Sequence, residues 1–157
     1  MKSKVIVKII SKTMVDGEEE KIELMTPGKF YKKGEAYFVV YEETEISGME
    51  GTTTTLKIES DELRIIRFGT TSSNLVFKKG IKHSSIYKTI YGIFEVNVEP
   101  SSMEIDVGES GGKIEIAYNL EAGGMAQSTN SMCIEIKAWG VKHKDTLGGI
   151  LWSIWLK

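Results

Sequence analysis

The stretch at residues 36–59, AYFVVYEETEISGMEGTTTTLKIE, decides the fold of this chain. Its first part, residues 36–43, is rich in aromatic and β-branched side chains and predicts a buried strand. Its last part, residues 52–59, alternates Thr52, Thr54, Leu56 and Ile58 with more polar residues, and four consecutive threonines favour a pleated sheet over a helix. The stretch therefore predicts two β-strands joined by a polar loop.

The same pattern extends outward in both directions. Further strands are predicted at residues 4–14, 21–25, 62–68, 74–77, 85–89, 91–99, 102–106, 113–120 and 131–138. Turn-forming pairs separate them, at Asp16-Gly17, Pro27-Gly28, Lys33-Gly34, Ser60-Asp61, Lys79-Gly80, Gly111-Gly112 and Gly123-Gly124. No helical apolar stripe longer than two turns precedes residue 139. Strands without helical crossovers pair antiparallel, so we expect an all-β, meander-type barrel of about eight to ten strands.

Composition limits the class of protein. The chain has 157 residues, one cysteine and a net charge of −2, and 41% of its residues are hydrophobic. These values suit one globular domain, and they exclude a disordered chain and a strongly basic nucleic-acid clamp. Cys133 cannot form an internal disulfide, which favours a reducing compartment. With no signal-peptide pattern at the start and no apolar stretch long enough for a bilayer, we expect a cytoplasmic protein without membrane contact.

The C-terminal segment differs from the rest, so we divide the chain into a barrel domain at residues 1–138 and a Trp-rich tail at residues 139–157. All three tryptophans lie in this tail. Its helical apolar stripe consists of Leu147, Ile150, Leu151, Ile154 and Trp155. Such a tail must be covered, by packing on the barrel, by plugging its mouth, or in a homodimer interface.

Several linked motifs resemble the YwiB-like family. They are Phe30-Tyr31-Lys32-Lys33-Gly34, Tyr41-Glu42-Glu43, Gly48-Met49-x-Gly51-Thr52-Thr53-Thr54-Thr55-Leu56-Lys57-Ile58, Arg67-Phe68-Gly69, Tyr87-Lys88-Thr89-Ile90-Tyr91-Gly92 and Ile114-x-Ile116-x-Tyr118-x-Leu120. The resemblance covers roughly residues 3–137. It implies a calycin-like (lipocalin-like) antiparallel β-barrel of bacterial origin, and it implies neither an activity nor a catalytic residue.

Motifs typical of catalysis, metal binding and nucleic-acid binding are weak. Residues 108–112, GESGG, match a nucleophile motif, but a strand rather than a helix follows them, which indicates a hairpin loop. Cys133, His83 and His143 lack the paired spacing of zinc ligands, so we expect no metal and no cofactor. The basic and aromatic residues 29–33 follow an acidic run in a net-acidic domain, so we expect no nucleic-acid partner.

Polar side chains on apolar strand faces are the strongest candidates for a site. Tyr41 and Glu43 share a face with Val39, and Arg67 shares one with Leu63 and Ile65. Tyr87 and Tyr91 share a face with Ile93, and Tyr118 shares one with Ile114 and Ile116. A buried charge costs several kcal/mol unless it is paired and hydrogen-bonded. Glu43 and Arg67 therefore form either a structural ion pair capped by tyrosines or part of a wet ligand cavity.

We favour a small-molecule-binding barrel without enzymatic activity. In this interpretation Glu43 and Arg67 orient a polar group of the ligand, and the tyrosines supply amphipathic walls. These wall residues are Tyr41, Tyr87, Tyr91 and Tyr118. The alternative is a non-enzymatic structural or interaction module that forms a homodimer through its tail; an enzyme is the least favoured of the three classes.

Overall fold

A computed structural model describes residues 2–124 and 126–139, and in these residues the chain forms ten strands and one short 3₁₀ helix. The elements are β1 (Ser3–Val15), β2 (Glu18–Lys33), β3 (Ala36–Glu42), η1 (Glu45–Ser47), β4 (Thr52–Ile58), β5 (Glu62–Gly69), β6 (Ser73–Lys78), β7 (His83–Thr89), β8 (Gly92–Gly108), β9 (Gly111–Ala122) and β10 (Ala126–Ala138). Within the described residues no helix is long and apolar enough to cross a membrane.

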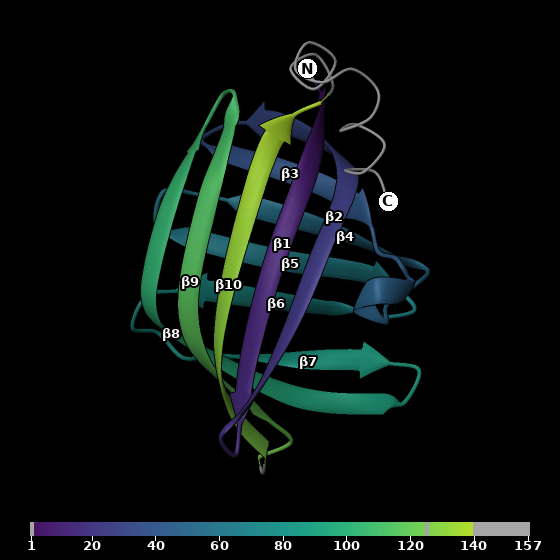
Figure 1. The fold of residues 1–157 in the computed structure, drawn as a ribbon, viewed down its shortest axis with the longest axis vertical. Helices are drawn as coiled ribbons and strands as arrows, with labels where there is room; N and C mark the ends of the chain where they lie inside the picture. Colours follow the sequence, from purple (N-terminus) through teal and green to yellow (C-terminus); the bar gives the residue numbers. More distant parts are fainter. Residues whose placement is uncertain (1, 125, 140–157) are drawn as a thin grey trace.

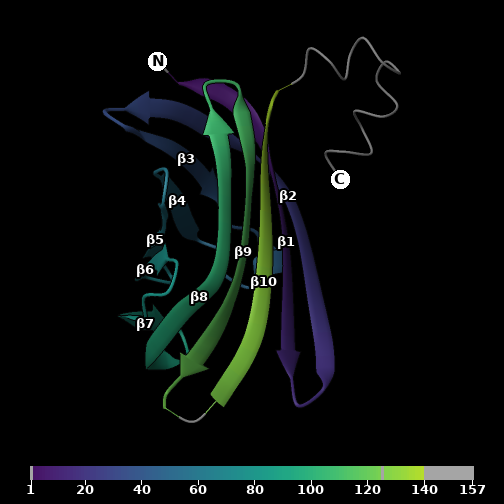
Figure 2. The same cartoon turned by 90° about the vertical axis from the view of Figure 1, so that its left-hand side faces the viewer.

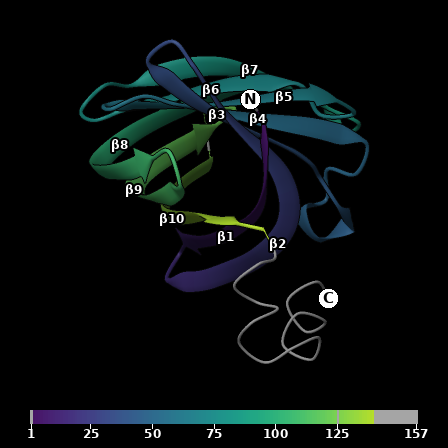
Figure 3. The ribbon, with the colours of Figure 1, turned by 90° about the horizontal axis from the view of Figure 1, so that it is seen from above.

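The strands form one antiparallel sheet in the order β6-β5-β4-β3-β2-β1-β10-β9-β8-β7. Every neighbouring pair is consecutive in sequence except β1 and β10, the first and last strands of the described residues. The sheet curls so that β3–β6 cross behind β1, β10 and β9, and the view from above shows it curving around an interior (Figures 1 and 3). The predicted all-β antiparallel barrel is confirmed.

The barrel is nearly closed between β6 and β7. These strands form no ladder, but Ser72 and Lys88 beside them exchange two backbone hydrogen bonds, each 2.9 Å long. Within the β6–β7 turn, the backbone N–H of Gly80 donates to the carbonyl of Pro100 in β8 at 2.9 Å. The opening therefore lies in the middle of the chain and not at its ends.

Alternation along each strand builds the core. In β4, the set Thr52, Thr54, Leu56 and Ile58 is buried, as the sequence predicts. The same rule places apolar residues of the other strands except β7 inside, and these include Val7, Leu24, Val39, Leu63, Phe77, Val98, Ile114 and Ile134, while β7 contributes only the partly buried Tyr87. One face of each strand therefore fills the barrel, and Figure 2 shows the long strands β8, β9, β10 and β1 curving around it.

Two predicted strand breaks are wrong. Pro27-Gly28 is not a turn, because β2 continues through it to Lys33. At this point β2 pairs with β1 but not yet with β3, so a residue without an N–H is tolerated on the open side. A Cβ on Gly28 would lie 3.1 Å from the carbonyl oxygen of Val40, so glycine permits a close crossing here.

Pro100 does not end a strand either. β8 passes through it with a register shift between Pro100 and Ser102, which is a β-bulge. The first part of β8 pairs with β7 and the later part with β9. The two strands predicted at residues 91–99 and 102–106 are therefore one bent strand.

The described chain ends at Trp139. Its backbone N–H donates to the carbonyl of Lys4 at 3.0 Å, and the Lys4 ammonium lies 4.6 Å from the centre of its indole ring. The rest of the predicted tail, with its helical stripe and homodimer contact, lies outside the described residues.

Candidate functional site

Strand register brings the polar candidates together inside the barrel. Tyr41 of β3 lies opposite Thr54 of β4, and Thr54 lies opposite Arg67 of β5. Directly opposed residues point to the same side of a sheet. Glu43 follows β3 directly, and its backbone N–H donates to the carbonyl of Thr52 at 2.8 Å, which holds its side chain on this inner face.

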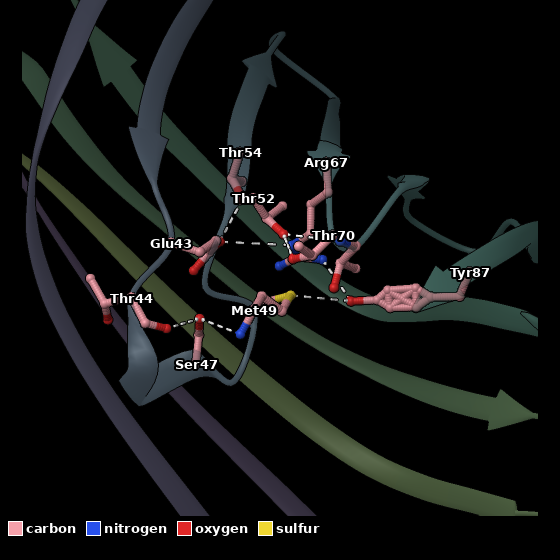
Figure 4. A network of polar contacts seen from close by, with 10 residues as sticks. Glu43, Thr44, Ser47, Met49, Thr52, Thr54, Arg67, Thr70 and Tyr87 are labelled. Atoms are coloured by element: carbon pink, nitrogen blue, oxygen red, sulfur yellow. Dashed lines mark hydrogen bonds and ion pairs between the residues drawn. The ribbon is translucent and has the colours of Figure 1, made fainter. Parts of the chain in front are cut away.

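Glu43 and Arg67 form a buried ion pair. The Arg67 Nε atom lies 3.8 Å from Glu43 Oε2, and the two side chains are 13% and 1% exposed. Oε2 accepts a hydrogen bond from Thr54 Oγ1, and Arg67 Nη1 donates to the hydroxyl of Tyr87 at 3.1 Å (Figure 4). Of the two alternatives that the sequence leaves open, the structure contains the Glu43–Arg67 ion pair, and it does not decide whether these residues also bind a ligand.

The ion pair leaves two charged-group atoms without a hydrogen-bond partner. A separation of 3.8 Å is too long for a hydrogen bond, so the pair is held by charge alone. Among the described residues, neither Glu43 Oε1 nor Arg67 Nε has a hydrogen-bond partner, and both atoms are fully buried. The Tyr41 hydroxyl also interacts with the Glu43 carboxylate, so Glu43 Oε1 and Arg67 Nε are two buried atoms without a hydrogen bond of normal geometry inside a polar cluster.

The tyrosines around the pair stay neutral. Burial, reinforced by the Glu43 carboxylate, raises the pKa of Tyr41 well above its usual value. Burial also raises the pKa of Tyr118. These phenols can therefore donate and accept hydrogen bonds but supply no charge.

A cavity of about 130 Å³ adjoins the pair. Its polar lining comes from Ser11, Tyr41, Glu43, Ser47 and Arg67. Its apolar lining comes from Ile9, Ile22, Leu24, Met49, Leu56, Ile65, Met132 and Ile134. The volume equals that of about four waters at roughly 30 Å³ each, which suits a compact chemical group rather than a drug-sized molecule.

The structure gathers five of the six predicted site residues. Tyr41, Glu43 and Arg67 line the cavity, and Tyr87 contacts Arg67 from β7. Tyr118 packs edge-on against Phe77, 5.0 Å between ring centres, and lies close enough to Arg67 for the guanidinium charge to favour its ionised form slightly.

Tyr91 is the exception. It lies in the turn between β7 and β8 and is 84% exposed, because β8 begins only at Gly92, with φ +136°. The alternation that places Tyr87 inside does not continue across this turn. The inward position expected for Tyr91, and for Ile93 beside it, is wrong.

Sequence reasoning missed three contributors, Thr54, Ser47 and Met49. Thr54 shares the face of Leu56 and Ile58, so the alternation predicts that its side chain points into the barrel. The alternation does not indicate that the Thr54 hydroxyl donates a hydrogen bond to Glu43. Ser47 and Met49 come from the loop between β3 and β4, which has no periodic pattern to indicate its conformation.

The other motifs noted in the sequence can be followed only within the described residues. Residues 108–112 make the tight β8–β9 hairpin, in which Gly108 pairs with Gly111, and strand β9 follows Ser110. Throughout residues 2–124 and 126–139, no three His, Cys, Asp or Glu side chains come close enough to hold a metal ion.

Comparison with known proteins agrees with this fold. The pattern of a domain of unknown function, DUF1934, matches residues 7–134. The chain is 30% identical over 120 residues to the "Uncharacterized beta-barrel protein YwiB" of Bacillus subtilis (strain 168), covering 76% of this chain and 82% of that protein. The crystal structure of the ywiB protein from Bacillus subtilis superposes with a TM-score of 0.80 at 25% identity, over 88% of this chain and 94% of that one.

Proposed function

The chain belongs to the DUF1934 family of YwiB-like β-barrel proteins, and from that premise we propose that it binds one small molecule inside its barrel. The binding group would sit in the cavity beside Glu43 and Arg67. The observation that supports this proposal is that the Glu43 and Arg67 side chains line the same cavity, while Glu43 Oε1 and Arg67 Nε are buried without a hydrogen-bond partner among the described residues.

Energetics support a ligand for these two atoms. A buried polar atom without a partner costs about 1–3 kcal/mol, and a charged group costs more. A molecule that donates to Glu43 Oε1 and accepts from Arg67 Nε recovers that cost on binding. The surrounding apolar lining then selects for shape. This arrangement also suits the calycin-like architecture expected from the sequence, since small barrels can hold one small ligand.

The residues favour binding over catalysis. An arginine side chain stays protonated in proteins, so Arg67 cannot exchange a proton with a substrate. Tyr41 and Tyr118 are held neutral by burial. The charged pair suits the orientation of a polar group, and we infer a carrier or sensor.

Native mass spectrometry of protein purified from its own host tests the proposal. Glu43→Gln replaces the buried carboxylate with a neutral amide of nearly the same volume. Glu42→Gln is its matched control. Glu42 lies on the outer face and accepts from Thr53 Oγ1, as Glu43 accepts from Thr54 on the inner face. We expect an extra mass on the wild type and on Glu42→Gln, and its loss from Glu43→Gln.

A second variant protects the test if Glu43→Gln folds poorly. Arg67→Lys keeps the positive charge but removes the Nε donor, and it should also lose the extra mass. An apo mass alone on the wild type would overturn the proposal. Retention of the extra mass by a folded Glu43→Gln or Arg67→Lys protein would overturn it as well.

A further inference from the structure

A second hollow lies beside the inner cavity and opens to solvent; we call it the vestibule. It holds about 420 Å³ between the β3–β4 loop, Thr70 and Thr71, and the β7–β8 hairpin. Its lining consists of Glu45, Gly48, Met49, Glu50, Thr70, Thr71, Tyr87, Thr89, Ile90 and Tyr91. Met49 belongs to the walls of both hollows, so the vestibule and the cavity adjoin at this side chain.

Met49 and Tyr87 stand at the boundary between the two hollows. The Tyr87 hydroxyl lies 3.7 Å from Met49 Sδ and also accepts from Arg67 Nη1, so it reaches from the vestibule to the ion pair (Figure 4). The loop carrying Met49 is held by local hydrogen bonds: Ser47 Oγ donates to the carbonyl of Thr44, and the Met49 N–H donates to Ser47 Oγ. The backbone is therefore fixed while the flexible thioether side chain can move.

The outer edge of the vestibule is apolar. Ile90 and Tyr91, at the tip of the β7–β8 hairpin, are 74% and 84% exposed. Single exposed apolar residues are common, but a group of them at the entrance to a cavity marks a place where an apolar molecule is covered. Tyr91 thus belongs to the entrance and not to the interior expected from the sequence.

Charge at the inner end favours a neutral head group. Glu43 and Arg67 offset each other, and the open atoms are one acceptor and one donor. A carboxylate would place a second negative charge beside Glu43 and pass Glu45 and Glu50 in the vestibule. An amide carries a carbonyl acceptor and an N–H donor on adjacent atoms, which matches both open atoms without adding charge.

We propose that the two hollows form one site for a neutral amphipathic molecule, with an amide-type head between Arg67 Nε and Glu43 Oε1. Its apolar body extends past Met49 into the vestibule, against Ile90 and Tyr91. This inference rests on the proposed function, and it adds the chemical class of the ligand and the route by which it enters.

Three probes separate the parts of this inference: acetamide, hexanamide and hexanoate, each titrated by NMR into the full-length protein. Hexanamide should bind at least about tenfold more tightly than acetamide, because each buried methylene contributes about 0.8 kcal/mol, or roughly fourfold in affinity. Hexanoate should bind at least tenfold more weakly than hexanamide at pH 7, since it brings a charge that the site does not match.

Variants at the boundary supply the controls. Tyr87→Phe removes the hydroxyl that contacts Met49 and Arg67, and it should weaken hexanamide binding. Tyr31→Phe is the matched control, because Tyr31 stacks on Phe38 away from the cavity. Met49→Ala removes the side chain shared by both hollows, and it should speed hexanamide association.

Each contrary outcome has one meaning. Equal affinity for acetamide and hexanamide would overturn the role of the vestibule, and tighter binding of hexanoate would overturn the neutral head; both would leave the proposed function standing. Failure of all three probes overturns the assigned ligand class. The proposed function itself fails if the wild type from its host carries no extra mass, or if a folded Glu43→Gln or Arg67→Lys protein keeps that mass.

Discussion

Arg67→Met tests whether burial, and not distance, decides the strength of an ion pair in this barrel. The substitution keeps most of the side-chain volume but leaves Glu43, 1% exposed, without its counter-charge. Breaking a buried pair by removing one partner typically costs about 3–5 kcal/mol. Because Thr54 still donates to the carboxylate, we take the lower end and expect a loss of about 3 kcal/mol.

Arg64→Met is the matched control, because Arg64 lies in the same strand, β5, three positions before Arg67. Arg64 Nε lies 2.9 Å from Glu62 Oε2, much closer than the inner pair, but the two side chains are 39% and 15% exposed. Solvent screening limits such pairs to about 0–1 kcal/mol. If distance alone decided the strength of an ion pair, Arg64→Met would lose more stability than Arg67→Met. If burial decides it, Arg67→Met loses more.

Equilibrium unfolding in urea measures both variants. With a slope of about 1.5–2 kcal/mol/M for a domain of this size, Arg67→Met should lower the midpoint by roughly 1.5–2 M, and Arg64→Met by less than about 0.5 M. Adding Glu43→Leu to Arg67→Met should recover part of the loss, because the unpaired charge is gone. Equal midpoints for the two single variants would refute the reasoning.

Three further predictions concern the same region. Burial raises the pKa of the Tyr41 phenol, so the neutral, buried phenol contributes its full stability below the unfolded pKa of about 10, and this contribution is lost as the pH rises above that value. The urea midpoint should therefore fall less between pH 9 and 11 in Tyr41→Phe than in the wild type. An identical fall in both proteins would contradict this. Thr54→Val removes a hydrogen bond to the buried carboxylate and should cost about 2 kcal/mol in urea unfolding, while Thr53→Val on the outer face should cost under about 0.5 kcal/mol; equal costs would speak against the inner network. Gly69→Ala would place a Cβ 2.2 Å from the carbonyl oxygen of Gly51 and should lower the melting temperature strongly. Gly80→Ala is the control, because φ is also positive there but no atom lies within 4 Å of the added Cβ. Similar decreases in melting temperature for the two variants would disprove the steric argument.

Much of the fold could be predicted because alternation is a local property. The run from Thr52 to Ile58 identifies its inner face from the leucine and isoleucine at its end. The same reasoning places Arg67 beside Leu63 and Ile65, and Glu43 beside Tyr41. Once strands pair with the right register, their inward polar residues must meet, so the sequence predicts that Glu43 and Arg67 come together, either as an ion pair or as the lining of a cavity.

The remaining features depend on contacts between distant parts of the chain. Pro27-Gly28 has the composition of a turn, and only the absence of a paired β3 on one side makes it a bend within β2. Tyr91 lies outside the barrel because the turn between β7 and β8 interrupts the alternation of inward and outward side chains. No local pattern in the sequence indicates that Arg67 Nε lies as far as 3.8 Å from Glu43 Oε2, or that Glu43 Oε1 and Arg67 Nε lack a hydrogen-bond partner among the described residues.

The side-chain Nε–H resonances of arginine report directly on the open donor. The chain contains only two arginines, Arg64 and Arg67, so the nitrogen–proton spectrum of these groups holds one signal from the site and one internal control. On addition of hexanamide to saturation, we expect the Arg67 Nε–H signal to shift downfield as it gains an acceptor, while the Arg64 signal stays in place. Binding of the probe with an unmoved Arg67 signal would contradict the assignment of this donor to the ligand.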